Sequence, residues 1–385
     1  MRIAILTSGI LPVPAVQGGA VENLVDFYLE YNNQHRLHDI TIYSVWHPDV
    51  KKHPALKSEV NHYIYIKTNG WWNKLKKKIY QKTHSKEYYH YTIEYFLHEV
   101  IKDIRHKQYE AIILENRPAY ALKLKAVTNA KLIYHLHNDD LNESISQANT
   151  LYNNADQIIT VSDYIKCRVQ TINPKDTKTT TVLNGIDSMS FATQSDKNRQ
   201  QHNDFMMVFS GRLIPEKGIL QLIQAMQQLK DYPDIKLVII GSGSLGSNQN
   251  LTPFQQQLRE AANGLDNIRF MGYIAYKKIA HYLQEAEVAV LPSVWEEPFG
   301  LTMAEAQAAG LPIITTKHGG IPEVVSSQNA ILLDTDEHFV DNLATAILDL
   351  YQHPEKRKQM AEASLKRSRL FDKETYAKNF FAAIE

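Results

Sequence analysis

The sequence predicts an α/β protein built from two doubly wound domains. Short β-branched runs alternate with helical patterns along the 385 residues. The strand segments are almost continuously apolar, as in parallel sheets that are covered on both faces. This alternation occurs twice, on either side of a polar segment without periodicity. We therefore expect two Rossmann-like domains facing one another, with ligands bound outside the carboxyl ends of the strands.

The elements follow this scheme in order. In the first domain, residues 1–187, the expected strands are Arg2–Leu6, Ile40–Val45, Ala111–Leu114, Lys131–His135, Gln157–Val161 and Thr180–Leu183. Residues 188–204 are expected to form a linker. In the second domain, residues 205–372, the expected strands are Phe205–Phe209, Lys236–Ile240, Ile268–Met271, Val288–Leu291, Pro312–Thr315 and Ala330–Leu333. A helix is expected after Gly218, and a closing helix in 373–385.

Composition excludes several classes of function. The 42 basic residues balance the 42 acidic ones, so bulk attraction to nucleic acid is not indicated. A single cysteine, Cys167, rules out an internal disulfide and a multi-cysteine metal site, and it fits a reducing cytosol. The apolar N-terminus is short and is interrupted by Pro12 and Pro14, which favours a first strand over a signal peptide. With no run of 18 apolar residues, we expect a cytoplasmic protein without a membrane span.

The most informative segment is the run from Glu297 to Glu305, which follows a buried strand. We expect Glu297 at the carboxyl end of that strand and Glu305 inside the next helix, with Pro298 in its first turn. Such a pair can take sugar hydroxyls with one carboxylate and a ribose with the other. The backbone N–H groups of Phe299, Gly300 and Leu301 would point at phosphates between them.

Two further loops carry phosphate-binding chemistry. Gly18 and Gly19 follow the first strand and allow close backbone approach before a helix that begins near Ala20, although a plain tight turn is the alternative. Gly211, Arg212 and Lys217 follow a strand of the second domain. Arg212 could fork onto diphosphate oxygens and Lys217 could supply a point charge, or the charged side chains could form surface ion pairs.

Two other patterns have competing interpretations. His137 ends a strand of the first domain and could donate to a sugar hydroxyl or a backbone carbonyl, or be merely structural. The neighbouring Asp139 and Asp140 suggest a metal site, which we reject because no complete ligand set is visible. The run 241–246 matches G-x-G-x-x-G, but the next helix begins near Pro253, too late for dinucleotide binding. Its glycines, Gly243 among them, are instead expected to lie beside a nucleotide base or diphosphate.

Taken in order, these motifs closely resemble the retaining glycosyltransferases of family 4, which have the GT-B fold, over nearly the whole chain. The loop 11–22 is also similar to sugar transferases of bacterial surface-polysaccharide and spore-coat clusters. The resemblance implies that the closing helix crosses back to the first domain. It also implies that no metal or other cofactor is needed.

The resemblance further assigns roles to the matching residues. Glu297 would bind hydroxyls of the donor sugar, Glu305 the ribose, and His137 the sugar near its 6-position. The leaving diphosphate would be neutralised by Arg212, Lys217 and the amides of the two glycine-containing loops. Met271 lies in a segment that the family uses near the base, and the Tyr273 that follows departs from the family pattern. The rival functions are a nucleotide-sugar epimerase of the same fold and a non-catalytic coat or surface-associated protein.

One region departs from charge neutrality. Between Lys51 and Lys86 there are ten lysines and one acid, Glu59, with Trp71 and Trp72 among them. This composition suits contact with an anionic membrane on the cytoplasmic face, and it also suits a solvated loop. The expected partners are thus a nucleotide-sugar donor, a glycan or lipid-linked acceptor, and an anionic membrane surface.

Overall fold

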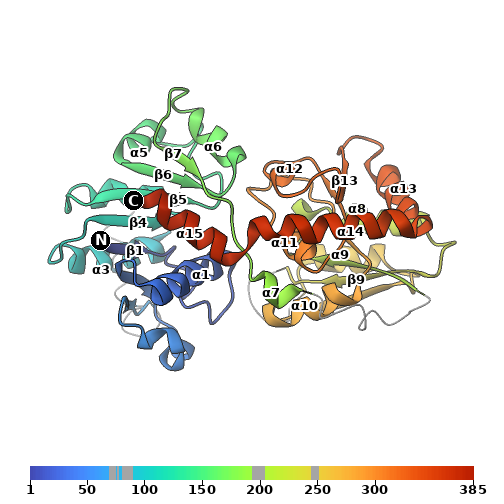
Figure 1. Ribbon diagram of the computed structural model, residues 1–385, viewed down its shortest axis with the longest axis horizontal. Helices are drawn as coiled ribbons and strands as arrows, with labels where there is room; N and C mark the ends of the chain where they lie inside the picture. Colours follow the sequence, from blue (N-terminus) through green and yellow to red (C-terminus); the bar gives the residue numbers. More distant parts are fainter. Residues whose placement is uncertain (69–74, 76–77, 80–89, 193–203, 244–250) are drawn as a thin grey trace. The chain divides into compact units, whose positions relative to one another are not determined.

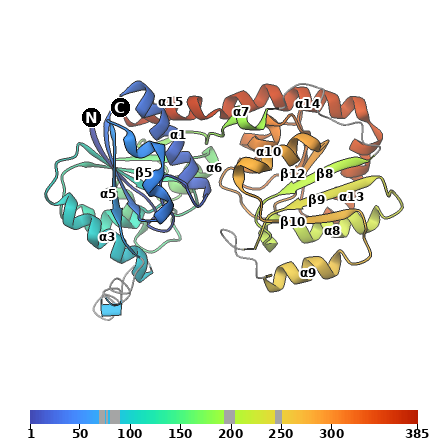
Figure 2. The same cartoon turned by 90° about the horizontal axis from the view of Figure 1, so that it is seen from below.

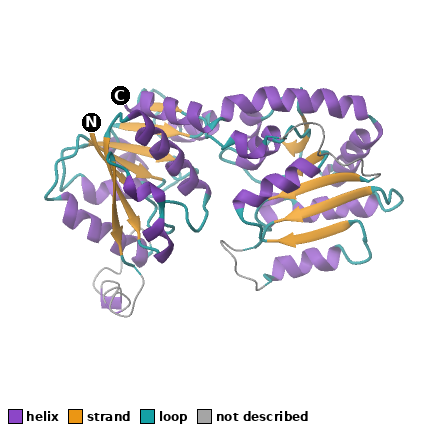
Figure 3. Cartoon of the chain, turned by 60° about the horizontal axis from the view of Figure 1, so that its bottom comes forward, coloured by secondary structure: helices purple, strands orange, loops and turns teal. Residues whose placement is uncertain are grey.

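A computed structural model describes the chain except for residues 69–74, 76–77, 80–89, 193–203 and 244–250 (Figure 1). It divides into two compact units. Unit 1 comprises Met1–Asn184 and Glu374–Glu385, and unit 2 comprises Gly185–Lys373. Each unit contains a parallel sheet with helices around it, so the predicted α/β class is confirmed (Figure 3).

Unit 1 is organised around a seven-stranded parallel sheet with the strand order β3-β2-β1-β4-β5-β6-β7. Its strands are β1 (Arg2–Leu6), β2 (Asp39–Val45), β3 (Asn61–Ile66), β4 (Ala111–Glu115), β5 (Lys131–Leu136), β6 (Gln157–Thr160) and β7 (Thr179–Thr181). Its helices are α1 (Ala20–His35), α3 (Tyr91–Ile104), α4 (Ala121–Leu124), α5 (Ala148–Asn154), α6 (Asp163–Gln170) and α15 (Lys373–Ile384), with short 3-10 turns at Pro48–Lys52, Pro54–Lys57 and Pro118–Tyr120. The order reverses between β1 and β4, which makes this the topological switch point.

Unit 2 repeats the arrangement with six parallel strands in the order β10-β9-β8-β11-β12-β13. The strands are β8 (Phe205–Ser210), β9 (Ile235–Ile240), β10 (Ile268–Gly272), β11 (Val288–Leu291), β12 (Ile313–Thr316) and β13 (Ala330–Leu333). The helices are α7 (Ser188–Phe191), α8 (Ile219–Gln228), α9 (Pro253–Ala261), α10 (Tyr276–Glu285), α11 (Leu301–Ala308), α12 (Ile321–Val324), α13 (Phe339–Gln352) and α14 (Pro354–Ser368), with 3-10 turns at Pro215–Lys217 and Arg369–Phe371. The switch point lies between β8 and β11.

Both faces of the unit 2 sheet are covered. Helix α8 contacts both α9 and α13, and α7 contacts both α10 and α11. Figure 2 shows α8 and α9 on one side of strands β8 to β10, and α7 and α10 on the other. Coverage on both faces explains why β8, β9 and β11 are almost continuously apolar in sequence.

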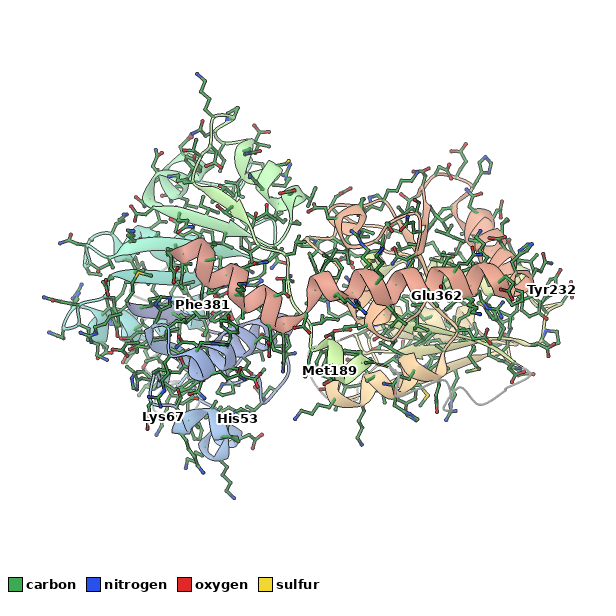
Figure 4. The ribbon with its side chains drawn as sticks, in the orientation of Figure 1. His53, Lys67, Met189, Tyr232, Glu362 and Phe381 are labelled. Atoms are coloured by element: carbon green, nitrogen blue, oxygen red, sulfur yellow. The ribbon has the colours of Figure 1, made fainter. Side chains whose placement is uncertain are left out.

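The closing helix α15 belongs to unit 1, as the resemblance implied. Its aromatic side chains are buried against α1, where Phe380 stacks on Tyr28 with ring centroids 4.3 Å apart. Phe381, labelled in Figure 4, meets the same tyrosine ring edge-on. Buried aromatic pairs of this kind contribute beyond the area that they remove from water. Ring packing between α15 and α1 therefore holds the closing helix on unit 1.

Every expected strand is present to within about two residues, and one strand was missed. β3 (Asn61–Ile66) pairs with β2 and lies inside the basic region. Its Tyr63 and Tyr65 rings stack 6.1 Å apart, and its polar residues concealed the strand pattern. Lys51 and Lys67 lie over the Trp46 ring at 5.8 and 5.6 Å, whereas Trp71 and Trp72 lie outside the described residues.

The linker expectation also needs a correction. Residues 188–191, expected to be irregular, form helix α7. Phe191 is buried and meets Tyr276 of α10 edge-to-face at 5.6 Å, so the apolar residue fixes this segment on unit 2. Most of the remaining linker lies outside the described residues. Within the described ranges, no helix is long and apolar enough to cross a bilayer.

Candidate active site

The carboxyl edge of the unit 2 sheet brings two of the predicted loops together. The loop after β8 contains Gly211 to Gly218, and the loop after β11 contains Pro292 to Glu297. Val294 donates its backbone N–H to the Glu216 carbonyl at 2.9 Å, and the Ser293 hydroxyl oxygen lies 3.1 Å from the same carbonyl oxygen. Gly218 permits this approach, because a Cβ there would lie 1.8 Å from the Pro292 carbonyl oxygen. The two loops therefore pack directly against each other at the switch point.

The predicted Lys217 and Glu297 meet at this point. The Lys217 ammonium and the Ser293 hydroxyl, at 2.7 Å, both donate to Oε1 of Glu297. Glu297 is 7% exposed, and Lys217 also lies 5.7 Å above the Trp295 ring. A buried carboxylate paired with one cation and one hydroxyl is held in a fixed orientation. These side chains line a pocket together with Phe209, Ser210, Gly211, Leu291, Thr302 and Met303.

Arg212 behaves differently from Lys217. It follows the same strand but is exposed, and within the described part of the chain it has no ion-pair partner. Its guanidinium remains available for a ligand with bidentate oxygens. The structure thus contains one cation committed to Glu297 and one uncommitted cation on the same loop.

Helix α11 begins later than predicted. Gly300 has φ 111° and ψ 57°, so helical geometry starts only at Leu301, and Pro298 lies outside the helix. The N-terminal N–H groups of α11 nonetheless lie next to the Lys217–Glu297 pair, because Thr302 and Met303 line the same pocket. Phe299 is buried against Phe371, with ring centroids 5.7 Å apart. This packing anchors the turn that presents the helix N-terminus.

Glu305 is an unusual carboxylate. It is 6% exposed within α11, and its hydrogen bond from the Tyr276 hydroxyl is outweighed by burial, which raises its pKa to about 7. No ion pair neutralises it within the described residues. A buried carboxylate whose pKa is raised this far is a candidate functional residue. The sequence predicted Glu305 but gave no sign of Tyr276 as its partner.

The other predicted residues of unit 2 lie around the same sheet edge. Met271 is in β10, half-buried. Gly243 lies against the N-terminus of α9, where a Cβ would come within 2.8 Å of the Thr252 methyl group. Thr252 and Gln255 form a capping box there. The helix start at Pro253 agrees with the argument against dinucleotide binding, while residues 244–250 lie outside the described residues.

The carboxyl edge of unit 1 has its own polar cluster at its switch point. Gly18 and Gly19 have φ of 74° and 115°, and a Cβ on Gly19 would lie 2.1 Å from a Glu22 carboxylate oxygen. Glu22 is 6% exposed, and burial raises its pKa. Asp26 accepts from the Ala15 N–H at 2.8 Å, and burial raises its pKa to about 7. Sequence reasoning missed both acids, since they read as polar residues of an amphipathic helix.

His137, one residue beyond the end of β5, is nearly buried and belongs to a side-chain network. Its Nε2 lies 2.8 Å from Oε2 of Glu115, and Nδ1 of His135 lies 3.1 Å from the same oxygen. The Tyr28 hydroxyl donates to the other carboxylate oxygen at 2.8 Å. Asp139 and Asp140, which the sequence analysis rejected as metal ligands, take no part in it. Asp139 instead accepts from Arg168 at 2.7 Å.

This network also has the composition of a metal site. Glu115, His135 and His137 each offer a ligand atom, and these atoms lie within 4.8 Å of one another. A structural zinc site uses four ligands at about 2.0–2.3 Å. Here a fourth side chain, Tyr28, instead donates a hydrogen bond to the carboxylate. The separations of 2.8 to 3.1 Å are ordinary hydrogen bonds, so the residues fit a polar network better than a metal centre.

Two doubly wound units, one with a cation–carboxylate pair and a helix N-terminus at its switch point, define a two-domain α/β protein with a polar site at a sheet edge. The chain belongs to the group 1 glycosyltransferases. The family model "Glycosyl transferases group 1" matches residues 190–367. The putative glycosyltransferase YtcC of Bacillus subtilis is 30% identical over 346 residues, covering 85% of this chain and 78% of that protein.

Two further relatives extend the match over the whole length. Spore coat protein SA of B. subtilis is 28% identical over 384 residues, covering 94% of this chain and 93% of that protein. The crystal structure of Anabaena Alr3699/HepE in complex with UDP aligns with a TM-score of 0.75 and 21% identity, covering 100% of this chain and 99% of that one. The neighbouring structures are GT-B glycosyltransferases, so the predicted fold is confirmed.

Proposed function

We propose that this protein is a metal-independent retaining glycosyltransferase that moves a hexosyl unit from a nucleotide-diphosphate sugar to a glycan or lipid-linked acceptor. The observation that carries the proposal is the pocket of unit 2, where Lys217, Glu297 and the start of α11 converge beside the uncommitted Arg212. A UDP-sugar is the favoured donor and a GDP-sugar the next. UDP is favoured because the structural relative Anabaena Alr3699/HepE has been solved with UDP and with UDP-glucose.

The charges of the site suit the chemistry. Breaking the bond between the anomeric carbon and the phosphate oxygen builds positive character on the sugar ring and negative charge on the diphosphate. Fixed cations and N–H groups at the leaving group stabilise that charge, usually the largest contribution to catalysis. Arg212, Lys217 and the α11 N-terminus supply them from the protein, so the step needs no divalent ion.

The remaining roles are those that the resemblance to family 4 implies. Glu297, held by Lys217 and Ser293, orients hydroxyls of the donor sugar. The Glu305 carboxylate accepts from the ribose hydroxyls, and His137 hydrogen-bonds to the sugar. In the retaining reaction, the acceptor oxygen attacks the anomeric carbon from the face of the leaving group. Its proton passes to the departing diphosphate oxygen, so no enzyme carboxylate forms a covalent intermediate.

The biological setting belongs to the proposal as well. We place the enzyme in the cytoplasm, in bacterial cell-surface polysaccharide synthesis, with Lys51–Lys86 touching the anionic inner face of the plasma membrane. Among the described residues of that region, Leu75 and Ile79 are 46% and 56% exposed. Sedimentation with anionic vesicles tests the contact, and replacing Trp71, Trp72 and Lys76–Lys78 should release the protein. Failure of the wild type to sediment with the vesicles removes this part of the proposal.

Donor turnover tests the function itself. The protein is incubated with a panel of nucleotide-sugars, and the released nucleoside diphosphate is measured for wild type, Arg212→Ala, Lys217→Ala and Glu305→Ala. Each variant should lose about 100-fold or more of the turnover of the preferred donor. Lys230→Ala, an exposed lysine of unit 2, serves as the matched control and should equal wild type. Equal turnover in all of the variants would contradict the proposal.

A non-catalytic alternative is kept because a relative that covers 94% of the chain is named a spore coat protein. A protein that only assembles into a coat needs no donor. It would show neither nucleotide-sugar binding by calorimetry nor nucleoside diphosphate release.

A further inference from the structure

The network behind His137 has a feature that the proposed reaction does not yet use. Four side chains from α1, β4 and the end of β5 meet with almost no solvent contact: Tyr28, Glu115 and His135 are 0% exposed, and His137 is 6% exposed. Glu115 is the centre, since both of its carboxylate oxygens receive hydrogen bonds. Burying a carboxylate this deeply costs free energy unless its oxygens accept hydrogen bonds.

The charge state of Glu115 fixes the direction of these hydrogen bonds. Burial alone would raise the pKa of Glu115, but the interactions with His135 and His137 outweigh it and hold the pKa well below its usual range. An ionised carboxylate can only accept hydrogen bonds. Nε2 of His137 and Nδ1 of His135 must therefore be the protonated nitrogens that donate to it.

The opposite nitrogen of His137 is then an acceptor. Burial, with the neighbouring His135 ring 4.2 Å away, lowers the pKa of His137 to about 4. The ring is thus neutral at physiological pH, with its single proton on Nε2. Nδ1 is buried and lacks a hydrogen-bond partner within the described residues. A buried acceptor nitrogen without a hydrogen bond is unfavourable, and a ligand hydroxyl could donate one to it.

The position of His137 is fixed as firmly as its proton. The Asn116 side-chain oxygen accepts from the backbone N–H groups of His137 and Asn138 at 3.0 and 3.1 Å. On the far side, Phe380 of α15 lies 5.0 Å from the His135 ring and stacks on Tyr28. The closing helix therefore packs directly on the network, at the carboxyl edge of the sheet where ligands of doubly wound folds bind.

We propose that Glu115 is a positioning residue that holds His137 in the Nε2–H tautomer, so that Nδ1 accepts a hydrogen bond from a hydroxyl of the sugar. The identity of that ligand rests on the proposed function, whereas the tautomer does not. The inference reverses the direction expected from sequence, in which His137 donates. It also assigns a role to Glu115, which no motif indicated.

The tautomer can be measured without any substrate. Two-bond 15N–1H correlation spectra of histidine-labelled protein distinguish protonated from bare ring nitrogens, and the His137 signals are those lost in His137→Gln. The expected wild-type pattern is a protonated Nε2 and a bare Nδ1 at pH 7. In Glu115→Gln, the amide oxygen still accepts from Tyr28 and its NH₂ faces Nε2, so the proton should move to Nδ1. A wild-type proton on Nδ1, or stoichiometric bound metal in the purified protein, overturns the proposal.

Donor analogues then test the consequence. Fluorine cannot donate a hydrogen bond, so one member of a deoxyfluoro nucleotide-sugar series should bind wild type about 10-fold more weakly than the parent donor. In Glu115→Gln, that difference should fall to about 3-fold or less, because Nδ1–H can approach the fluorine. Tyr28→Phe keeps the carboxylate and should retain the wild-type preference. An unchanged fluorine effect in Glu115→Gln refutes the inference even where donor turnover proves the function.

Discussion

Burying Glu305 without a cation lowers the stability of unit 2 at neutral pH, and Glu305→Gln should recover it. Glutamine has nearly the same shape, and its side-chain oxygen can still accept the hydrogen bond from Tyr276. It carries no charge at any pH. The variant should therefore be more stable than wild type, while a ribose loses the carboxylate that accepts its hydroxyls.

The magnitude and its pH dependence follow from the pKa of Glu305, about 7 in the folded protein against an ordinary value of 4.5. Because the folded pKa is raised, the favourable contribution is present below pH 4.5 and is lost as pH rises through 7. At about 1.4 kcal/mol per pKa unit, wild type loses roughly 2.5 kcal/mol between pH 5 and pH 8 through this group. For a unit as long as Gly185–Lys373, that corresponds to about 5–10 °C in Tm.

Thermal unfolding at pH 5 and pH 8 is the assay, with Glu260→Gln as the matched control, since Glu260 lies exposed in α9. The Tm of Glu305→Gln relative to wild type should be higher at pH 8 than at pH 5, and that of the control should not change with pH. Titration with UDP should show weaker binding by Glu305→Gln at pH 8. A variant equally or less stable than wild type at pH 8 would refute the reasoning.

Three other predictions concern the same unit. UDP should bind wild type more tightly at pH 8 than at pH 6, because ribose binding favours ionised Glu305. Calorimetry in matched buffers measures this pH dependence of the affinity. If Glu305→Gln shows the same pH dependence, other groups cause it. Lys217→Ala should lower the free energy of unfolding by about 1–3 kcal/mol, because Glu297 stays buried without its paired cation. Arg212→Ala should change it by under about 0.5 kcal/mol. Equal effects of the two substitutions in urea denaturation would contradict this contrast. Gly218→Ala should destabilise the protein by more than about 1 kcal/mol, since φ is 66° and the added Cβ collides with the Pro292 carbonyl. A Tm equal to that of wild type would contradict this, because the loop would then accommodate the methyl group.

Sequence patterns revealed the framework of unit 2 because its sheet is covered on both faces. The apolar runs of β8 and β11 and the glycine-containing turns after them identify parallel strands and their carboxyl ends without knowledge of contacts. β3 escaped because Asn61–Ile66 mixes tyrosines with polar residues inside a lysine-rich region. The late start of α11 depends on a positive φ at Gly300, which a Pro-Phe-Gly sequence does not dictate.

The site residues likewise include some that the sequence indicates and some that only the structure reveals. Lys217 and Glu297 stand out by their position after strands, and their pairing over 80 residues had to await the structure. Glu115 is 20 and 22 residues from its two histidines and 87 from Tyr28. Within an apolar strand it carries no local signal, so its role emerges only from three-dimensional contacts.

The central claim, that the unit 2 pocket acts on a nucleotide-sugar through protein cations alone, is tested most directly by donor turnover in the presence of a chelator. Wild-type protein with EDTA is given the nucleotide-sugar panel, and nucleoside diphosphate release is followed with and without added Mg²⁺ or Mn²⁺. The account predicts turnover of at least one donor at the same rate in all three conditions, and its loss in Lys217→Ala. No release from any donor, or release only after metal is added, would contradict it.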